Sequence, residues 1–366
     1  MVKRVAALML GLLVACSAAA FDVSSLSIKV GDIERHKDAL AGFFPTLLEA
    51  GVSYTGITLL PENRTSIDVL IGGAYMSRDY WKDSAGEETI ADEQYASVWS
   101  ARWEVLFNQG FLRSDWTGKD MVTLSGGVSG RWEGFADTGG VDYFFDGALP
   151  DVDGIVSNAL VAGMLIDMVA FDGIIPKGAS LGVRYQYSPL FLSFIGESDY
   201  QLLTGTLTGY LPLYSMNQAD GKNLFSVYLA NRIQADMFFG FDEHVPIFAQ
   251  DEPSLGSKMR GLERLSRAGS LTVVNNFDIR LVGPELYMDR LYPRLHVFAD
   301  FGYFNGVLAN GAAEEQSEMF GSVGAEAGLS LFDFLNLGYR GSYMVLGENM
   351  LKETFVHGVY LSLQFK

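Results

Sequence analysis

The chain has 366 residues, of which 26 are lysine or arginine and 44 are aspartate or glutamate, so its formal net charge is −18. This acidic excess excludes the broad basic surface that nucleic-acid binding requires, and no nucleic-acid partner is expected. Cys16 is the single cysteine, which excludes a disulfide within the chain and a zinc site built from several thiolates.

The first predicted element is an export signal at the N-terminus. Lys3 and Arg4 precede an apolar stretch over residues 5–15, and alanines at 18–20 offer a small-residue cleavage site. A basic start, an apolar run and small residues at the cut are typical of a secretory signal peptide, which we assign to residues 1–20.

A second interpretation of the same segment stays open. Residues 13–16 read Leu-Val-Ala-Cys and resemble a lipobox, which would make Cys16 a lipidated N-terminus. In either case we expect residues 21–42 to form a short periplasmic segment and residues 43–366 to form the main domain.

Much of the remaining chain alternates between apolar and polar residues. One segment sets Val273, Phe277, Ile279 and Leu281 against Thr272, Asn276, Asp278 and Arg280. Successive side chains of a β-strand point to opposite faces, so a period of two predicts strands that are apolar on one face and polar on the other.

Two features favour a membrane barrel over a soluble β-sandwich, whose strands also alternate, and a third leaves strands as the only element that could span a membrane. Aromatic residues make up 13% of the chain, and membrane barrels gather aromatics at both interfaces. The last strand pattern ends on Phe365, as barrel-closing strands characteristically end on an aromatic, although Lys366 follows it. No segment after the signal offers the roughly 18 uninterrupted apolar residues of a spanning helix. We therefore predict an all-β fold, a transmembrane antiparallel β-barrel over residues 43–366.

Thirteen strands are predicted with some clarity. They cover residues 47–59, 66–75, 97–107, 121–132, 159–171, 179–188, 200–211, 225–238, 271–281, 295–303, 321–331, 335–345 and 356–365. Single-chain bacterial barrels usually have an even number of strands, so about 14 to 16 are expected. We expect the missing strand either in the region 136–156 or around residues 26–30.

Sequence motifs typical of catalytic or metal sites are weak in this chain. Residues 178–182 read Gly-Ala-Ser-Leu-Gly and match the serine-hydrolase elbow, which requires a strand, a sharp turn and then a helix, whereas a strand is predicted after this turn. The four histidines are scattered without metal-ligand spacing. We predict no enzyme activity, no catalytic residue, no metal and no cofactor.

Five short motifs occur in an order that resembles a known family. They are the turn 172–178, the tyrosine-bearing strand 200–212, the loop 255–261 with Lys-Met-Arg-Gly at its end, the strand 275–280 with Asn-Phe-Asp-Ile-Arg, and the strand 298–302 with Phe-Ala-Asp-Phe-Gly. Together they resemble the barrel of the bacterial surface antigen superfamily, which includes outer-membrane protein insertases and two-partner-secretion translocators. Five predicted strands after the Arg-Gly loop also agree with that family, which implies 16 strands in all.

The resemblance implies a contact between the loop and the lumen. In the family, the loop arginine folds back and bonds the aspartate of the Phe-x-Asp-x-Gly strand, which here pairs Arg260, followed by Gly261, with Asp300. Period two places Asp300 on the lumen face, and Asp278 on the same face one strand earlier is a second candidate partner. The alternative is that Arg260 is an ordinary loop charge and Asp300 a solvated lumen residue.

Two departures from the family matter. Met259 and Leu262 replace the usual valine and aromatic residue beside Arg260-Gly261, which predicts weaker packing of the loop tip. The residues before the first predicted strand are also too few for the family's periplasmic docking domains, so we expect any client to be recruited by a separate periplasmic accessory protein.

The function implied by the resemblance is insertion or translocation of proteins or lipids at the bacterial outer membrane. The expected partners are outer-membrane lipid and unfolded or secreted protein clients. The leading alternative is a passive porin-like channel or a structural surface antigen barrel, and a barrel-embedded hydrolase is a remote third.

Overall fold

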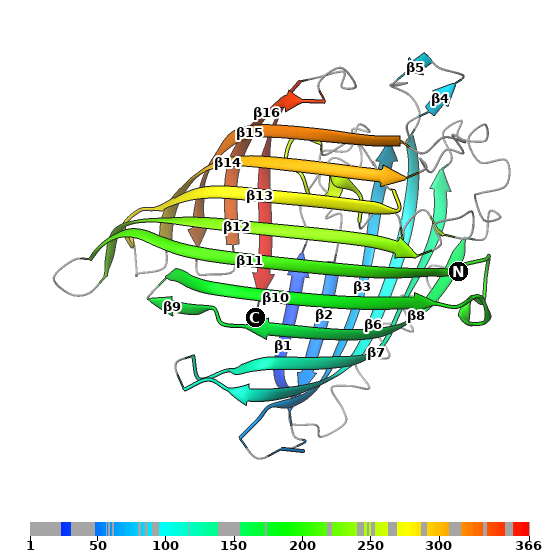
Figure 1. The fold of residues 1–366 in the computed structure, drawn as a ribbon, viewed down its shortest axis with the longest axis horizontal. Coiled ribbons are helices and arrows are strands. Elements are labelled where there is room, and N and C mark those ends of the chain that lie inside the picture. Colours follow the sequence, from blue (N-terminus) through cyan, green and yellow to red (C-terminus); the bar gives the residue numbers. More distant parts are fainter. Residues whose placement is uncertain are drawn as a thin grey trace.

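The computed structural model describes residues 23–30, 48–55, 57, 59–60, 62–79, 82–84, 87–89, 95–115, 117–137, 154–172, 174–217, 222–239, 245–246, 249, 253–262, 269–286, 291–306, 316–331, 335–347 and 354–365. Within these residues the architecture is one large, curved antiparallel sheet (Figure 1).

Fourteen strands make the wall of this sheet. They are β1 (Val23–Val30), β2 (Leu48–Tyr54), β3 (Thr65–Asp79), β6 (Tyr95–Arg113), β7 (Asp120–Asp137), β8 (Ile155–Asp167), β10 (Ile175–Ser188), β11 (Tyr200–Asn217), β12 (Asn223–Phe239), β13 (Leu271–Val282), β14 (Leu291–Gly306), β15 (Gln316–Leu331), β16 (Leu335–Leu346) and β17 (Phe355–Phe365).

The smaller elements lie at the ends of wall strands or between them. Strand β9 (Ala170–Asp172) pairs with the start of β10, and β4 (Lys82–Ser84) pairs with β5 (Glu87–Thr89). Two 3-10 turns, η2 (Leu190–Leu192) and η3 (Leu255–Ser257), follow β10 and β12. Among the described residues, no helix is both long and apolar enough to cross a membrane.

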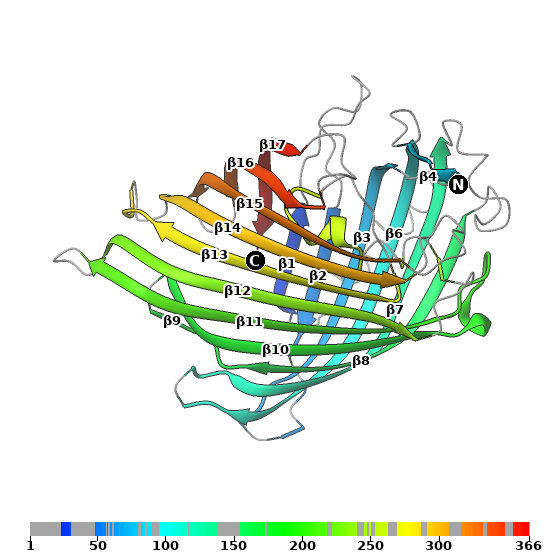
Figure 2. The same ribbon diagram turned by 45° about the horizontal axis from the view of Figure 1, so that its top comes forward.

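Neighbouring wall strands pair in chain order, which is the simplest up-and-down topology. The first and last strands also meet, since Ile28 lies opposite Phe365 and Val30 opposite Leu363. This β1–β17 pairing contains three residue pairs and is the shortest junction between wall strands. The strands consequently curl around an interior, with β10 to β15 on one side and β1 to β3 on the other (Figures 1 and 2).

The two faces of the wall differ in chemistry, and strand β14 shows the difference. Leu295, Val297 and Phe301 are 43%, 48% and 55% exposed on the outer face. Asp300 and Phe298, on the alternate positions, are buried on the inner face. The alternation predicted from the sequence therefore holds in this strand: the outward positions carry exposed apolar side chains, and the inward positions carry the charged Asp300 and the buried Phe298.

The strands were predicted correctly except for one at the N-terminus. All thirteen predicted segments overlap observed strands, and the missing strand is β1, which covers the predicted alternative 26–30. Strand β1 also lies within residues 21–42, so that segment is not separate from the sheet and the expected boundary at residue 43 is wrong in this respect. The described residues provide fourteen wall strands, not the 16 implied by the family resemblance.

Candidate functional site

Part of the long connection between β12 and β13 folds back onto the inner face of the wall. Its described residues 253–262 contain η3, which lies against β13 and β14 inside the curved sheet (Figure 2). Wall side chains bind its backbone: Thr272 Oγ1 donates to the carbonyl of Pro253 at 2.6 Å, and Asn276 Nδ2 donates to that of Lys258 at 3.1 Å. Ser322 Oγ donates to the carbonyl of Arg260 at 2.5 Å. We call residues 253–262 the docked loop.

The strongest contact of the docked loop joins Arg260 to Asp300. The guanidinium donates from Nε to Asp300 Oδ2 at 2.8 Å and from its terminal nitrogen to Oδ1 at 2.5 Å. The backbone N–H of Arg260 also donates to Oδ2, at 2.9 Å. Two parallel charge-assisted bonds are the geometry in which arginine holds a carboxylate most firmly.

Asp278 on the neighbouring strand is a second acceptor for the same arginine. Arg260 donates to Asp278 Oδ1 at 2.6 Å, and Arg280, two residues along β13, donates to Oδ2 at 2.6 Å. Asp300 is 0% exposed and Asp278 is 3% exposed. Two arginines and two aspartates thus form an electrically neutral cluster, which is how ionised groups are tolerated at such depth.

The aromatic ring of Phe298 lies beneath this cluster. The guanidinium carbon of Arg260 is 3.8 Å from the ring centroid, which is a cation–π contact. Burial alone would lower the pKa of Arg260, but the hydrogen bonds and charges of Asp300 and Asp278 outweigh it and raise that pKa. The guanidinium therefore stays protonated throughout the physiological pH range.

An apolar cluster flanks the charged one. It consists of Leu255, Met259, Leu262, Val274, Phe304, Phe320 and Met344, all nearly or fully buried. Met259 and Leu262 are each 1% exposed, so the prediction of weak loop-tip packing was wrong. The reason is complementary shape: Gly302 carries no side chain, and the flexible thioether of Met259 fills the space over it.

Gly261 is needed where it stands. Its φ of +99° lies in the left-handed region, where a residue with a Cβ is strained. An added Cβ would also lie 3.1 Å from the sulfur of Met344 and 3.4 Å from side-chain atoms of Ser322 and Ser342. Glycine therefore lets the chain turn directly against the wall after Arg260.

The structure does not bring the other singled-out residues into a site. Ser180 lies inside β10, paired with Asp167 and Thr208 on the adjacent strands and not at a strand-to-helix turn. The backbone of Phe365 pairs with Ile28 in the first strand, and Cys16 lies outside the described residues. Among the described residues, no group of three or more His, Cys, Asp or Glu side chains could hold a metal ion.

Sequence reasoning missed two interactions of this site, one made by Arg280 and one between Lys258 and Asp236. Arg280 was placed on the lumen face but given no role, although its position two residues after Asp278 on one strand face was a usable signal. The ion pair between Lys258 and Asp236 of β12 adds a second charged attachment for the docked loop. No local pattern indicated that pair, because it depends on where the loop crosses the wall.

Comparisons with known proteins give only a distant likeness. No protein-family model matches the sequence, and no curated protein matches it. Among solved structures, the chain is similar to CdiB from Acinetobacter baumannii at 11% identity and a TM-score of 0.49, over 87% of this chain and 50% of that one. It therefore spans half the length of CdiB.

Two further solved structures are more distant. A bacterial polysaccharide outer membrane secretin is 8% identical with a TM-score of 0.38, over 93% of this chain and 96% of that one. The transport unit of the autotransporter AIDA-I from Escherichia coli is 11% identical with a TM-score of 0.24, over 94% and 91%. All three TM-scores are below 0.5, so the description of this chain rests on its own strands and contacts.

Proposed function

We propose that this chain is a β-barrel of the bacterial outer membrane that inserts or translocates proteins or lipids, with the docked loop restricting its lumen. The docked loop is the observation on which this proposal rests. A loop fixed to the inner wall by a buried, neutral charge cluster narrows the lumen, and its release would open the lumen, as a gated transporter requires.

The membrane location is supported by the chemistry of the wall. Large apolar side chains are exposed on the outer face of strand after strand, which water would not tolerate over such an area. Strands β13 and β14 have 12 and 16 residues, and about 9 to 11 tilted residues suffice to cross a bilayer. Antiparallel pairing satisfies the backbone polar groups that lipid cannot.

The transport role is supported by the order of motifs that resembles the bacterial surface antigen superfamily. The hydrogen bonds from Arg260 to Asp300 support it, because the resemblance implies a contact between these two residues. On this proposal the partners are outer-membrane lipid and unfolded or secreted protein clients, delivered by a separate periplasmic accessory protein.

A second candidate is a passive porin-like channel or a structural surface barrel. Away from the docked loop, Asn108 joins Asp68 and Ser125 in a polar network on the inner wall. Polar side chains that bond one another along a wall are compatible with a water-filled lumen.

Conductance and depletion together separate these candidates. In planar bilayers the protein should give small, fluctuating currents, and Asp300→Ala should give larger and steadier ones because the docked loop loses its main acceptor. Depletion in cells should reduce the assembly or secretion of other outer-membrane proteins. Large steady currents from the unaltered protein, together with normal assembly on depletion, would establish the passive pore instead.

The β-barrel fold can be tested independently of its function. Folded protein extracted in detergent should run at a different apparent mass from boiled protein on a gel, because outer-membrane barrels resist unfolding by the gel detergent. Its circular dichroism should show strand and little helix. Identical migration before and after boiling, with a helical spectrum, would contradict the fold.

A further inference from the structure

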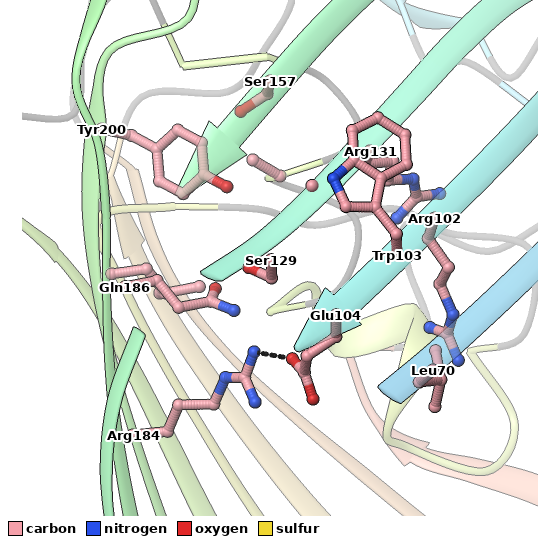
Figure 3. Close-up of a pocket in the computed structure, with 13 residues that line it drawn as sticks. Leu70, Arg102, Trp103, Glu104, Ser129, Arg131, Ser157, Arg184, Gln186 and Tyr200 are labelled. Carbon is pink, nitrogen blue, oxygen red and sulfur yellow. Dashed lines mark hydrogen bonds and ion pairs between the residues drawn. The ribbon is translucent and has the colours of Figure 1, made fainter. Parts of the chain in front are cut away.

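The inner and outer faces of the wall differ in where polar side chains are expected. On the inner face they can pair around open space: Arg184 pairs with Glu104 at a cavity of about 320 Å³ that Arg102 and Arg131 also line (Figure 3). The outer face, in the proposed membrane location, meets hydrocarbon, which offers no hydrogen-bonding partner. A polar side chain in the middle of the outer face therefore requires an explanation.

Two asparagines, Asn231 of β12 and Asn275 of β13, lie on the outer face. The alternate residue Asn276 binds the docked loop on the inner face, so Asn275 points outward, as does Phe277. Asn231 lies directly opposite Phe277 in register and is the middle residue of the 17-residue β12. Ile233 and Phe277, the next outward residues of the two strands, are each 37% exposed. The two asparagines thus interrupt the apolar band well away from the ends of β12.

The two asparagines bond each other but do not use all of their hydrogen-bonding groups. Asn231 Nδ2 donates to Asn275 Oδ1 at 2.6 Å and to the backbone carbonyl of Asn276 at 3.3 Å. An asparagine amide has two N–H donors and one carbonyl oxygen. Within the part of the chain that the structure describes, no contact occupies the side-chain nitrogen of Asn275 or the side-chain oxygen of Asn231. One donor group and one acceptor therefore remain available on the outer face.

The outer surface beside Asn231 carries no side chain at one position. Gly209 of β11 lies directly opposite Asn231 in register, and a Cβ added to Gly209 would meet no atom within 4 Å. Leu207 and Leu211, the next outward residues of β11, are 45% and 58% exposed. Small residues at such positions let transmembrane segments approach closely enough for their polar side chains to bond.

The partner of this surface has to supply a donor and an acceptor inside the hydrocarbon layer. Lipid tails supply neither, so the partner is a second protein surface within the membrane. A second copy of this chain offers matching groups, because a two-fold axis brings the free donor of each copy to the free acceptor of the other. We propose that two copies associate side by side across β11 to β13, with Asn275 of each copy donating to Asn231 of the other. This inference rests on the membrane location in the proposed function and not on transport.

Disulfide cross-linking of the full-length protein in vesicles of phosphatidylethanolamine and phosphatidylglycerol tests this contact. Cys16→Ser removes the only native thiol, and Phe277→Cys places one opposite Asn231. Oxidation should give a band at twice the mass of the chain on a non-reducing gel. The matched control is Val128→Cys on β7, 44% exposed and adjacent to the cavity-lining Ser129, which places it on the outer face. It should stay monomeric, and equal cross-linking of the two thiols would show random collision and overturn the proposal.

Substitutions within the surface then test the contact itself. Asn231→Leu and Gly209→Leu should each lower the dimer yield of Phe277→Cys about tenfold or more, the first by removing hydrogen bonds and the second by covering the bare position. The matched control is Gly358→Leu on β17, where an added Cβ also has open space, and its yield should not change. A yield that neither Asn231→Leu nor Gly209→Leu lowers would overturn the contact.

Heat-modifiable migration separates failure of this inference from failure of the proposed location. Protein that migrates identically before and after boiling would overturn the membrane location, and the association with it. Heat-modifiable protein in which Phe277→Cys gives no dimer would overturn the association alone. A cross-linked band in intact cells at a mass other than twice that of the chain, without a dimer in vesicles, would show that the partner is a different membrane protein and not a second copy.

Discussion

Asp300→Ala should release the docked loop from the wall. The substitution removes the acceptor for three N–H groups of Arg260, one from the backbone and two from the guanidinium. Asp278 remains, but Arg280 already shares it. Removing one partner of a buried ion pair costs about 3–5 kcal/mol, and each 1.4 kcal/mol is a factor of ten. Exposure of the loop should therefore increase by roughly a hundredfold or more.

The measurement uses a cysteine placed in the docked loop. Ser254 is 3% exposed, so Ser254→Cys with Cys16→Ser provides one buried thiol whose maleimide labelling rate reports loop release. Asp68→Ala is the matched control, since Asp68 is a wall aspartate bonded to Ser53 and Asn108 and not to the loop. Its labelling rate should match that of the unaltered background.

A double-mutant cycle tests whether the two residues act together. Arg260→Ala should also speed labelling, and the double variant should behave nearly as Asp300→Ala alone, because both changes remove one contact. Rates that multiply in the double variant, or a rate that changes in neither single one, would show that Arg260 and Asp300 do not hold the loop jointly.

Met259→Ala should release the docked loop through packing and not through charge. Met259 lies in the apolar cluster at 1% exposure over Gly302, and truncation of a buried methionine costs about 2–5 kcal/mol because a cavity remains. Labelling at Ser254→Cys should rise about thirtyfold or more. The ion pairs of Arg260 are left unchanged by this substitution.

Met216→Ala provides the comparison for this variant. Met216 is 40% exposed on β11, so its truncation leaves no buried cavity and should not alter the labelling rate. If Met259→Ala labels as slowly as Met216→Ala, the apolar cluster contributes nothing to docking and the charge cluster holds the loop alone.

Sequence patterns predicted the wall well because they are local. The alternation in residues 271–281 and 295–303 predicted both strands and placed Asp278 and Asp300 on the inner face, where they lie. Strand β1 was harder to predict. Its pairing with the last strand involves residues more than 300 positions apart, and its own pattern is short.

The sequence by itself determined that the chain forms amphipathic strands and which face of each strand is polar, whereas the contact of Arg260 with Asp300 was expected only from the family resemblance. Only the tertiary structure decided that Arg260 shares Asp278 with Arg280, that Met259 packs over Gly302, and that Arg102, Arg131 and Arg184 meet at one cavity. The physical reason is that the first features depend on neighbouring residues of one strand, and the second on residues brought together from distant parts of the chain. Side-chain alternation follows from the backbone of a single strand, whereas these contacts depend on the curvature and stagger of the assembled sheet.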